Sequence, residues 1–293
     1  MLNKIQIVLQ YILPKRWLTE VIGLIAQWRG GLITQWMIKL FIYIYRINMN
    51  EVQQTNITKY PTFNTFFTRK LRSNARPINN NPSILVMPAD GIISQIGQIN
   101  KKYILQAKGH YYSLESLLAG NNDMINYFEN GNFSTIYLSP SNYHRVHMPC
   151  DGILRETLYI PGDLFSVNPL ITKNIANLFA RNERLICLFE TNFGLIAQIL
   201  IGAIIMGSIE TVWLGTITPP RKGVIKHWHH AQSNKINKIV LSKGQEMGLF
   251  KLGSTVINLF PKNKITFDHQ LHSNHISKIG LPLAKINNIK IEQ

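Results

Sequence analysis

The sequence predicts an α+β protein in which a β-rich domain follows an amphipathic helical segment. Three observations predict this fold class. Apolar residues up to position 47 recur at helical spacing. After residue 50, short apolar or alternating runs lie between Gly, Pro and Asn residues, which is typical of strands. Helical patches are few in that part. We therefore predict a helical segment over 1–50 and a β-rich domain over 51–293.

The helical segment carries two apolar stripes. The first consists of Trp17, Leu18, Val21, Ile22, Ile25 and Trp28, and the second of Ile33, Trp36, Met37, Leu40, Phe41 and Ile44. Residues 14–16 and 29–31 interrupt the apolar runs with Pro, Gly and basic residues. Two or three short amphipathic helices are therefore expected.

These helices are too short and too interrupted to span a membrane. A spanning helix needs roughly 20 consecutive apolar residues, and the longest candidate, 30–45, contains Lys39. No small-residue cleavage site follows the first run, so a signal peptide is not expected. Tryptophan and Lys/Arg beside the stripes favour helices lying in the membrane interface. The alternative is that they pack on the core of the protein itself.

The β-rich domain is predicted from eight short runs and three helical patches. The strands are expected at 84–87, 91–96, 134–138, 152–159, 185–190, 194–201, 236–241 and 255–260. The helical candidates cover 60–71, 113–118 and 168–177. No P-loop, G-x-G-x-x-G or G-x-S-x-G motif occurs.

Composition points to an anionic partner. The chain has 31 Lys+Arg against 15 Asp+Glu, a formal charge of +16, and its two ends carry most of the surplus. Nucleic acid, anionic lipid or an acidic substrate would suit this charge. The only two cysteines, Cys150 and Cys187, form neither a disulfide framework nor a zinc pattern, which fits a reducing compartment.

Three residues could supply an acid, a base and a nucleophile: Asp90, His147 and Ser254. A Ser-His-Asp triad is defined by geometry and not by chain order. From spacing alone the assignment is weak, because Asp90 between Pro88 and Gly91 also suits a turn. A lone Gly-Ser-Thr is a weak signal as well.

Two histidine groups raise the question of a metal site. His144 and His147 are three residues apart, but no third ligand sits at useful spacing. His227, His229 and His230 form a tract beside Arg221, Lys222 and Lys226. The positive charge favours a loop or surface strand there, so no metal site is expected.

Seven segments in order resemble the phosphatidylserine decarboxylase family of the bacterial membrane-associated type. They are FFTRKLRSNARPI (66–78), MPADG (87–91), AKGHYYSLESLL (107–118), YLSPSNYHRVHMPCDG (137–152), PGDLFSVNP (161–169), LFARNERLICLFET (178–191) and KGQEMGLFKLGSTVINLF (243–260). Together they cover about residues 51 to 267. The resemblance departs at Ile204, where relatives often carry a smaller polar residue, and this puts the local wall of the site in doubt.

The resemblance implies a proenzyme that cuts itself between Gly253 and Ser254. The products would be a β chain of residues 1–253 and an α chain of residues 254–293. Ser254 would become an N-terminal pyruvoyl group, the covalent cofactor, with no metal involved. Asp90 and His147 match the family's self-cleavage triad: His147 would take the Ser254 proton, and Asp90 would hold the His147 ring.

The implied activity is that of a carboxy-lyase in phospholipid biosynthesis. A Schiff base between the pyruvoyl group and phosphatidylserine would release CO₂ and give phosphatidylethanolamine. His144 is the candidate proton donor, since histidine can donate near neutral pH. Its alternative role is to pack or to bind phosphate.

The expected partners are phosphatidylserine, an anionic membrane surface and the two chains of the same precursor, with a homodimer left open and no nucleic acid. The expected location is peripheral, on the cytoplasmic side of the cell membrane. Two rival functions remain: a Ser-His-Asp lipid hydrolase that uses intact Ser254, and a non-enzymatic basic protein bound to membrane or nucleic acid.

Overall fold

The computed structural model describes residues 2–107, 109–205, 208–230, 238–251 and 254–287. Eight α-helices lie within these residues: α1 (Leu2–Ile12), α2 (Lys15–Gln27), α3 (Leu32–Tyr45), α4 (Phe63–Phe67), α5 (Leu114–Leu117), α6 (Asn122–Phe128), α7 (Pro169–Thr172) and α8 (Leu178–Arg181). Two 3₁₀ turns, Met49–Glu51 and Ile57–Lys59, connect α3 to α4. The predicted α+β class is confirmed.

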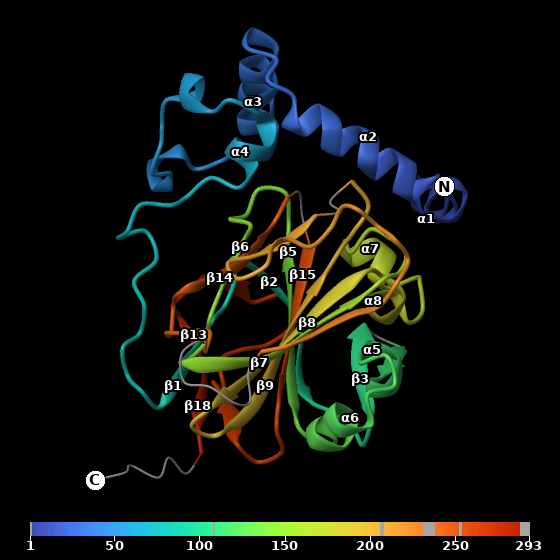
Figure 1. The fold of residues 1–293 in the computed structure, drawn as a ribbon, viewed down its shortest axis with the longest axis vertical. Helices are drawn as coiled ribbons and strands as arrows, with labels where there is room; N and C mark the ends of the chain where they lie inside the picture. Colours follow the sequence, from blue (N-terminus) through green and yellow to red (C-terminus); the bar gives the residue numbers. More distant parts are fainter. Residues whose placement is uncertain (1, 108, 206–207, 231–237, 252–253, 288–293) are drawn as a thin grey trace.

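The predicted N-terminal helices are present and end where the sequence breaks the pattern. Pro14 occupies the N-cap of α2, where its missing N–H costs nothing. Gly31 caps the start of α3 at φ +55°, and Arg46 ends that helix in the left-handed region. Figure 1 shows these three helices gathered at one end of the β-rich part.

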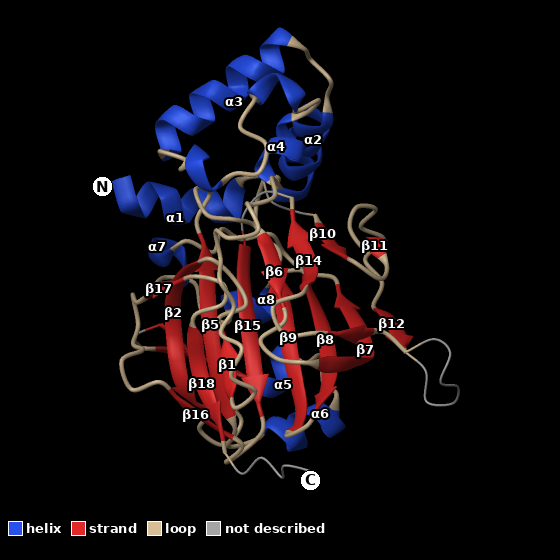
Figure 2. Cartoon of the chain, turned by 90° about the vertical axis from the view of Figure 1, so that its left-hand side faces the viewer, coloured by secondary structure: helices blue, strands red, loops and turns tan. Residues whose placement is uncertain are grey.

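A nine-stranded antiparallel sheet forms the centre of the molecule (Figures 1 and 2). Its strand order is β12-β7-β8-β9-β15-β5-β2-β17, with β13 also paired to β7. The strands are β2 (Gly91–Gln98), β5 (Asn132–Leu138), β7 (Gly152–Ile160), β8 (Arg184–Thr191), β9 (Gly194–Ile201), β12 (Lys226–His229), β13 (Val240–Leu241), β15 (Ser254–Phe260) and β17 (Ile276–Ser277).

Three smaller sheets complete the β structure. One has the order β1-β18-β16, one β11-β10-β14-β6, and the third is the β3–β4 hairpin. Their strands are β1 (Ile84–Val86), β3 (Tyr103–Ala107), β4 (His110–Ser113), β6 (Arg145–His147), β10 (Ile209–Thr211), β11 (Gly215–Thr216), β14 (Glu246–Phe250), β16 (Ile265–Phe267) and β18 (Pro282–Ile286).

The large sheet is buried on both faces. Val256 of β15 belongs to the core that includes β1, β6, β14 and β18, whereas its neighbour Ile257 belongs to the core under α5–α8. Successive side chains of a strand point to opposite faces. Every residue of β15 is therefore buried, which explains why this strand reads as a nearly continuous apolar run.

Two predicted helices are much shorter than expected. Of the candidate at 168–177, only α7 (Pro169–Thr172) is helical. The sequence predicted a helix over 60–71, but α4 covers only Phe63–Phe67, opened by a capping box between Thr62 and Thr65. Beyond it, Leu71 forms a β-bridge with Val52, and Gln53 N–H donates to the Lys70 carbonyl at 2.9 Å. This pairing holds the chain extended. The run predicted at 236–241 is a strand only at Val240–Leu241, and its first residues lie outside the described part.

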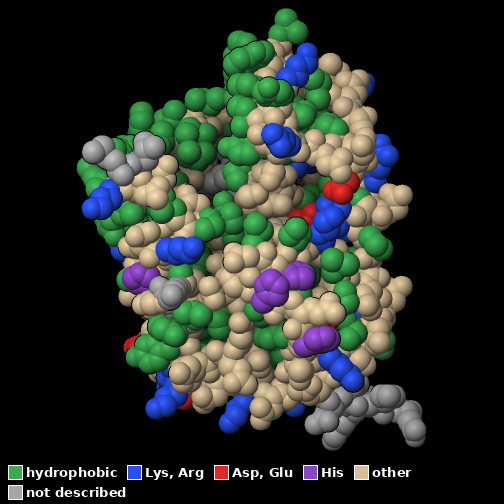
Figure 3. Space-filling view, turned by 180° about the vertical axis from the view of Figure 1, so that it is seen from behind, with side chains coloured by type: hydrophobic (Ala, Val, Ile, Leu, Met, Phe, Trp, Pro, Cys, Tyr) green, Lys and Arg blue, Asp and Glu red, His purple; other side chains and the backbone are tan. Residues whose placement is uncertain are grey.

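The N-terminal helices have one packed side and one exposed side. Ala26, Ile38 and Phe41 pack with Phe63 and Phe67 of α4 in a separate apolar cluster. Large apolar side chains elsewhere on these helices are exposed, among them Trp17, Leu24, Trp28, Leu32, Trp36 and Tyr43. Figure 3 shows hydrophobic side chains gathered on this end of the molecule, with Lys and Arg between them. No helix among the described residues is both long and apolar enough to cross a bilayer.

Candidate active site

Ser254 is the first residue of β15, in the middle of the large sheet. It pairs with Leu138 of β5, and only 1% of its surface is exposed. Its Oγ is buried and has no hydrogen-bond partner in the described part of the chain. Gly253, the other residue of the predicted cleavage site, lies outside the described residues. A nucleophile candidate thus sits buried, with its hydroxyl unused by the fold.

Ser254 lines an apolar cavity of about 400 Å³ between the N-terminal helices and the sheet. The helices contribute Ile22, Ile25, Ala26, Met37, Phe41, Tyr45, Phe63 and Phe67 to its wall. The opposite wall comes from β5 and three loops, through Tyr137, Leu138, Pro140, Ser166, Val167, Asn168, Ala203, Ile204 and Ile205. Ile204, where the sequence departs from the family pattern, is therefore part of this wall.

His147 ends β6 and is held by a backbone carbonyl. Its Nδ1 lies 2.8 Å from the oxygen of Gly244, and because a carbonyl only accepts, Nδ1 carries the proton. Nε2 is left unprotonated, 3.4 Å from the Tyr143 hydroxyl. Burial lowers the pKa of His147 below its usual value, and the Gly244 bond and the nearby charges of Glu246 and Asp90 partly offset this. The ring is therefore neutral at pH 7 and can accept a proton at Nε2.

Asp90 is buried beside an arginine. Its carboxylate accepts from Arg76 Nε at 3.0 Å and from Arg76 Nη2 at 2.6 Å, and also from the backbone N–H of Ile279 at 2.9 Å. Arg76 in turn contacts Glu51 at 2.7 Å. These bonds hold the Asp90 carboxylate in place.

The structure differs from the predicted triad in how His147 is oriented. Among the hydrogen bonds of the described residues, none joins two of Asp90, His147 and Ser254. The carbonyl of Gly244 accepts the hydrogen bond from His147 Nδ1 that the Asp90 carboxylate was expected to accept. Asp90 acts on His147 only through its charge, which raises the pKa of the ring.

His144 is fully buried next to Phe67, whose ring also lines the apolar cavity. The two ring centroids are 4.2 Å apart. Nδ1 donates to the Asn142 carbonyl at 2.9 Å, and Nε2 is buried without a hydrogen-bond partner. Burial lowers the pKa of His144 to about 3. His144 is thus neutral near pH 7, and its role as the proton donor stays a prediction.

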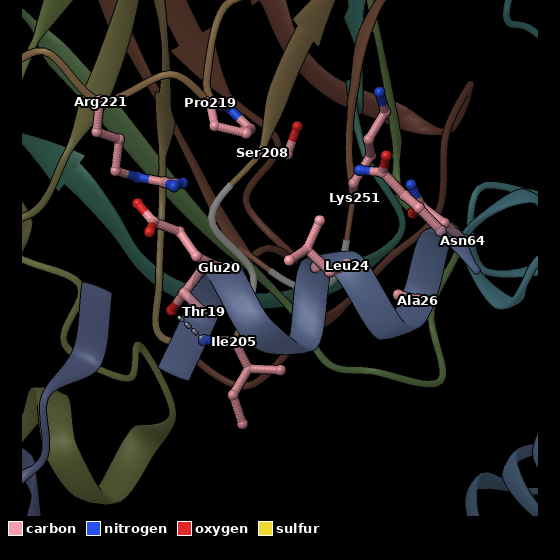
Figure 4. A pocket seen from close by; sticks show the side chains of 12 residues that line it. Thr19, Glu20, Leu24, Ala26, Asn64, Ile205, Ser208, Pro219, Arg221 and Lys251 are labelled. Carbon is pink, nitrogen blue, oxygen red and sulfur yellow. Dashed lines mark hydrogen bonds between the residues drawn. The ribbon is translucent and has the colours of Figure 1, made fainter. Parts of the chain in front are cut away.

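A second, more polar cavity of about 320 Å³ adjoins the first beneath α2 and shares Ala26 and Ile205 with it. Figure 4 shows Glu20 and Leu24 of α2 on one side and Arg221, Ser208 and Lys251 on the other. The Ile205 N–H donates to Thr19 Oγ1 at 3.0 Å and ties α2 to the loop after β9. Arg221 pairs with buried Glu183 at 2.9 Å.

Sequence reasoning missed three residues that contact the predicted ones: Arg76, Tyr143 and Gly244. Each lies inside a segment that carried the resemblance, at positions 66–78, 137–152 and 243–260. Arg76 and Gly244 act on residues 14 and 97 positions away, so no local signal distinguishes them. Tyr143 is four residues from His147, but a tyrosine at that spacing is not by itself a site signal. The histidine tract lies on β12 and directly after it, so the predicted surface strand is confirmed.

The chain is similar to known proteins over nearly its whole length. The model of the phosphatidylserine decarboxylase family matches residues 63–285, and a second model, described only as PSD, matches 5–46. A phosphatidylserine decarboxylase proenzyme of Blochmanniella pennsylvanica is 60% identical over 288 residues, which cover 97% of this chain and 98% of that protein. A protein of the same name from Sodalis glossinidius is 58% identical over 284 residues, which cover 97% of this chain and 96% of that protein. Another from Escherichia coli is 60% identical over 284 residues, which cover 97% of this chain and 88% of that protein.

Proposed function

The chain belongs to the phosphatidylserine decarboxylase family, and we propose that it converts phosphatidylserine to phosphatidylethanolamine after cutting itself between Gly253 and Ser254. The β chain would comprise residues 1–253 and the α chain residues 254–293. The names of the relatives, which include the word proenzyme, support this two-stage activity.

The observation that carries the proposal is the position of Ser254. This serine is buried in an apolar cavity, its Oγ has no partner among the described residues, and exposed apolar helices border the cavity. A cavity of this kind suits the apolar part of a lipid whose amine must reach one buried residue.

The first stage needs only the chain's own residues and water. Ser254 Oγ attacks the carbonyl carbon of Gly253, and His147 Nε2 accepts the hydroxyl proton. The peptide C–N bond breaks, and Gly253 becomes an ester on Oγ. Removal of the Ser254 Cα proton then expels Gly253 as a carboxylate and leaves a dehydroalanine. Its imine tautomer is hydrolysed by water, which supplies the ketone oxygen of the pyruvoyl group and releases ammonia. The Gly244 carbonyl fixes the tautomer of His147, and the charge of Asp90 stabilises the imidazolium that forms.

The surroundings of Ser254 fit a pyruvoyl group. The group would replace the Ser254 side chain, which lines the apolar cavity and whose buried Oγ has no partner in the described part. When formed, the group would supply a ketone that reacts with the substrate amine and accepts the electrons left as CO₂ departs.

His144 would move a proton during the second stage. Its neutral Nε2 can accept a proton from the ammonium group of phosphatidylserine, and the imidazolium can return this proton to Cα after CO₂ leaves. The low pKa of His144 makes it a strong donor once it is protonated. In this way the residue is still the proton donor, although its resting state is neutral.

Residues 1–50 would hold the protein on the cytoplasmic face of the cell membrane as a peripheral protein. Trp17, Trp28 and Trp36 are 63%, 52% and 62% exposed. Such side chains favour the membrane interface, and each well-placed Lys or Arg adds about 1 kcal/mol on an anionic surface. The cavity that contains Ser254 is lined by the same helices.

The test combines intact mass with a lipid assay. We expect the purified chain to appear as two chains, the smaller one with the mass loss of a pyruvoyl group, and to form phosphatidylethanolamine from phosphatidylserine vesicles. Ser254→Ala and His147→Ala should remain a single chain of 33.6 kDa without activity. The matched control Ser116→Ala, at an exposed position of α5, should be cut normally. An uncut wild-type chain with esterase activity would establish the lipid hydrolase instead.

A further inference from the structure

A histidine pair on the edge strand β12 lies against a glutamate of β7. His227 and His229 are two residues apart, so their side chains share one face of the strand. Their ring centroids are 4.0 Å apart. His229 pairs with Glu156 across the two strands. One carboxylate oxygen of Glu156, Oε2, lies 2.8 Å from His227 Nε2. The other, Oε1, lies 4.0 Å from His229 Nδ1. Figure 2 shows β12 beside β7 at the edge of the sheet.

We infer that Glu156, His227 and His229 form a surface site for a divalent transition-metal ion, with Zn²⁺ as the ion that fits best. One donor atom from each residue lies within 4.8 Å of the others. In the part of the chain that the structure describes, no other group of three or more His, Cys, Asp or Glu side chains has this arrangement. The inference departs from the sequence-based expectation that no metal site is present.

The donors match the chemistry of zinc. Two imidazoles and one carboxylate are a ligand set that Zn²⁺ accepts, with water in the fourth position. Bonds of about 2.0–2.2 Å in a tetrahedron place neighbouring donor atoms about 3.4 Å apart. The contacts of 2.8 Å and 4.0 Å lie on either side of that spacing. Side-chain rotation alone can therefore bring the three donors onto one ion. Ni²⁺ and Cu²⁺ favour the same imidazole donors.

Two of the three positive charges that argued against a metal, those of Arg221 and Lys226, have partners away from the two histidines. Arg221 pairs with the buried carboxylate of Glu183. The Lys226 ammonium lies 6.0 Å from the centre of the Tyr159 ring, and alternation along β12 places its side chain on the face opposite His227. Glu156 is therefore the nearest charged partner of the two histidines.

His230 does not belong to the site. The Nε2 of His230 lies 2.9 Å from Thr157 Oγ1. Thr157 follows Glu156 in β7, so the Thr157 side chain points to the face opposite that of Glu156. The tract thus divides into two ligands and one residue that supports the strand pairing.

The proposed site is separate from Ser254. Four strand spacings separate β12 from β15 in the sheet, which is about 19 Å at 4.8 Å per strand. An ion there would join the edge strand β12 to β7 and stabilise their pairing by mass action. It would take no part in decarboxylation.

The test uses the full chain without a polyhistidine tag, stripped with a chelator and titrated with ZnCl₂ by calorimetry. We expect one Zn²⁺ at this site. Glu156→Gln, His227→Ala and His229→Ala should each weaken it at least about tenfold, since even losing a group that only supports a ligand costs 10–100-fold. His229→Ala is the cleanest variant, because its side chain is 71% exposed. The control His272→Ala with His275→Ala, a surface pair with rings 5.5 Å apart of which His272 is exposed and His275 half-buried, should bind as the wild type does.

A second measurement separates site loss from misfolding. Zn²⁺ should raise the unfolding temperature of the wild type and of the His272/His275 control, but not that of the His227→Ala/His229→Ala double variant. Both variants should keep phosphatidylserine decarboxylation, because neither touches the cavity. The inference is overturned if the stripped wild type binds no Zn²⁺, or if the His227/His229 double variant binds it with the same stoichiometry and affinity.

Discussion

The Nδ1 of His147 lies 2.8 Å from the carbonyl oxygen of Gly244, and this bond sets which nitrogen of the ring can act as a base. In a Ser-His-Asp hydrolase the carboxylate has that role. Here the carboxylate of Asp90 is occupied by Arg76 and the Ile279 N–H. The loop that precedes β14 therefore orients the histidine on which self-cleavage is proposed to depend.

Gly244→Ala should slow self-cleavage. Gly244 has φ +76°, and an added Cβ would lie 2.8 Å from Ile78 Cγ1, so either the Ile78 side chain or the Gly244 backbone that holds His147 must shift. The measurement is the fraction of uncut chain against time after synthesis. Gly215→Ala is the matched control, because Gly215 has φ +66° but an added Cβ would meet nothing within 4 Å. Both variants should lose about 1 kcal/mol of stability, and equal cleavage rates would show that the Gly244 carbonyl does not orient His147.

His144→Ala should be cut normally and yet decarboxylate poorly. His144 has no hydrogen bond to His147 or Ser254 among the described residues, but its free Nε2 suits proton transfer to the substrate. We expect kcat to fall about 10²-fold or more, the contribution of one general acid–base group. Intact mass reports cleavage, and phosphatidylethanolamine formation reports activity. A variant that is cut and fully active would rule out this role.

The stability of the uncut chain should fall as the pH drops below about 6.5. The pKa of His144 is about 3 in the folded protein against 6.5 for an unperturbed histidine, and the pKa of His147 is also lowered. Between these values the unfolded chain binds the proton that the folded chain refuses, so acid favours unfolding. His144 alone should account for roughly 1.5–2 kcal/mol between pH 6.5 and 5.

Urea unfolding at several pH values in the Ser254→Ala background, where the chain stays whole, checks this dependence. His144→Gln in that background should flatten the pH dependence by about one proton. Exposed His272→Gln should leave the dependence unchanged. If the free energy of unfolding of His144→Gln keeps the same pH dependence, a group other than His144 causes it.

Arg76→Ala should destabilise the protein by about 3–5 kcal/mol, because it leaves the buried Asp90 carboxylate without its ionic partner. Arg76→Lys should lie between this variant and the wild type, since an ammonium cannot bind both carboxylate oxygens as the guanidinium does. Lys102→Ala removes an exposed pair with Glu129 and should cost less than about 1 kcal/mol. Equal losses for Arg76→Ala and Lys102→Ala would contradict this account of Asp90.

Replacing Trp17, Trp28 and Trp36 together with Ala should release the protein from anionic vesicles. The three side chains are more than half exposed, so the fold should survive, while binding to phosphatidylglycerol vesicles falls roughly tenfold or more. Sedimentation with vesicles measures the bound fraction. Tyr103→Ala with Tyr111→Ala, similarly exposed on the β3–β4 hairpin, is the control. Unchanged sedimentation of the tryptophan variant would argue against docking through these helices.

Much of the fold follows from local patterns. The helical spacing of apolar residues located α2 and α3, and the runs at 194–201 and 255–260 located β9 and β15 almost to the residue. Such patterns work because each element buries a face with a fixed period. The strands β6 and β10 escaped detection, because three residues are too few to show an alternating pattern.

The sequence by itself determined the fold class, the family and the candidates Asp90, His144, His147 and Ser254, because these depend on residue type and on motifs of consecutive residues. Only the tertiary structure decided which groups meet. It placed the Gly244 carbonyl on His147, Arg76 on Asp90 and Glu156 between His227 and His229. It also made His144 neutral by burying it. Hydrogen bonds and desolvation act over a few ångströms of space, and the distance along the chain does not encode them.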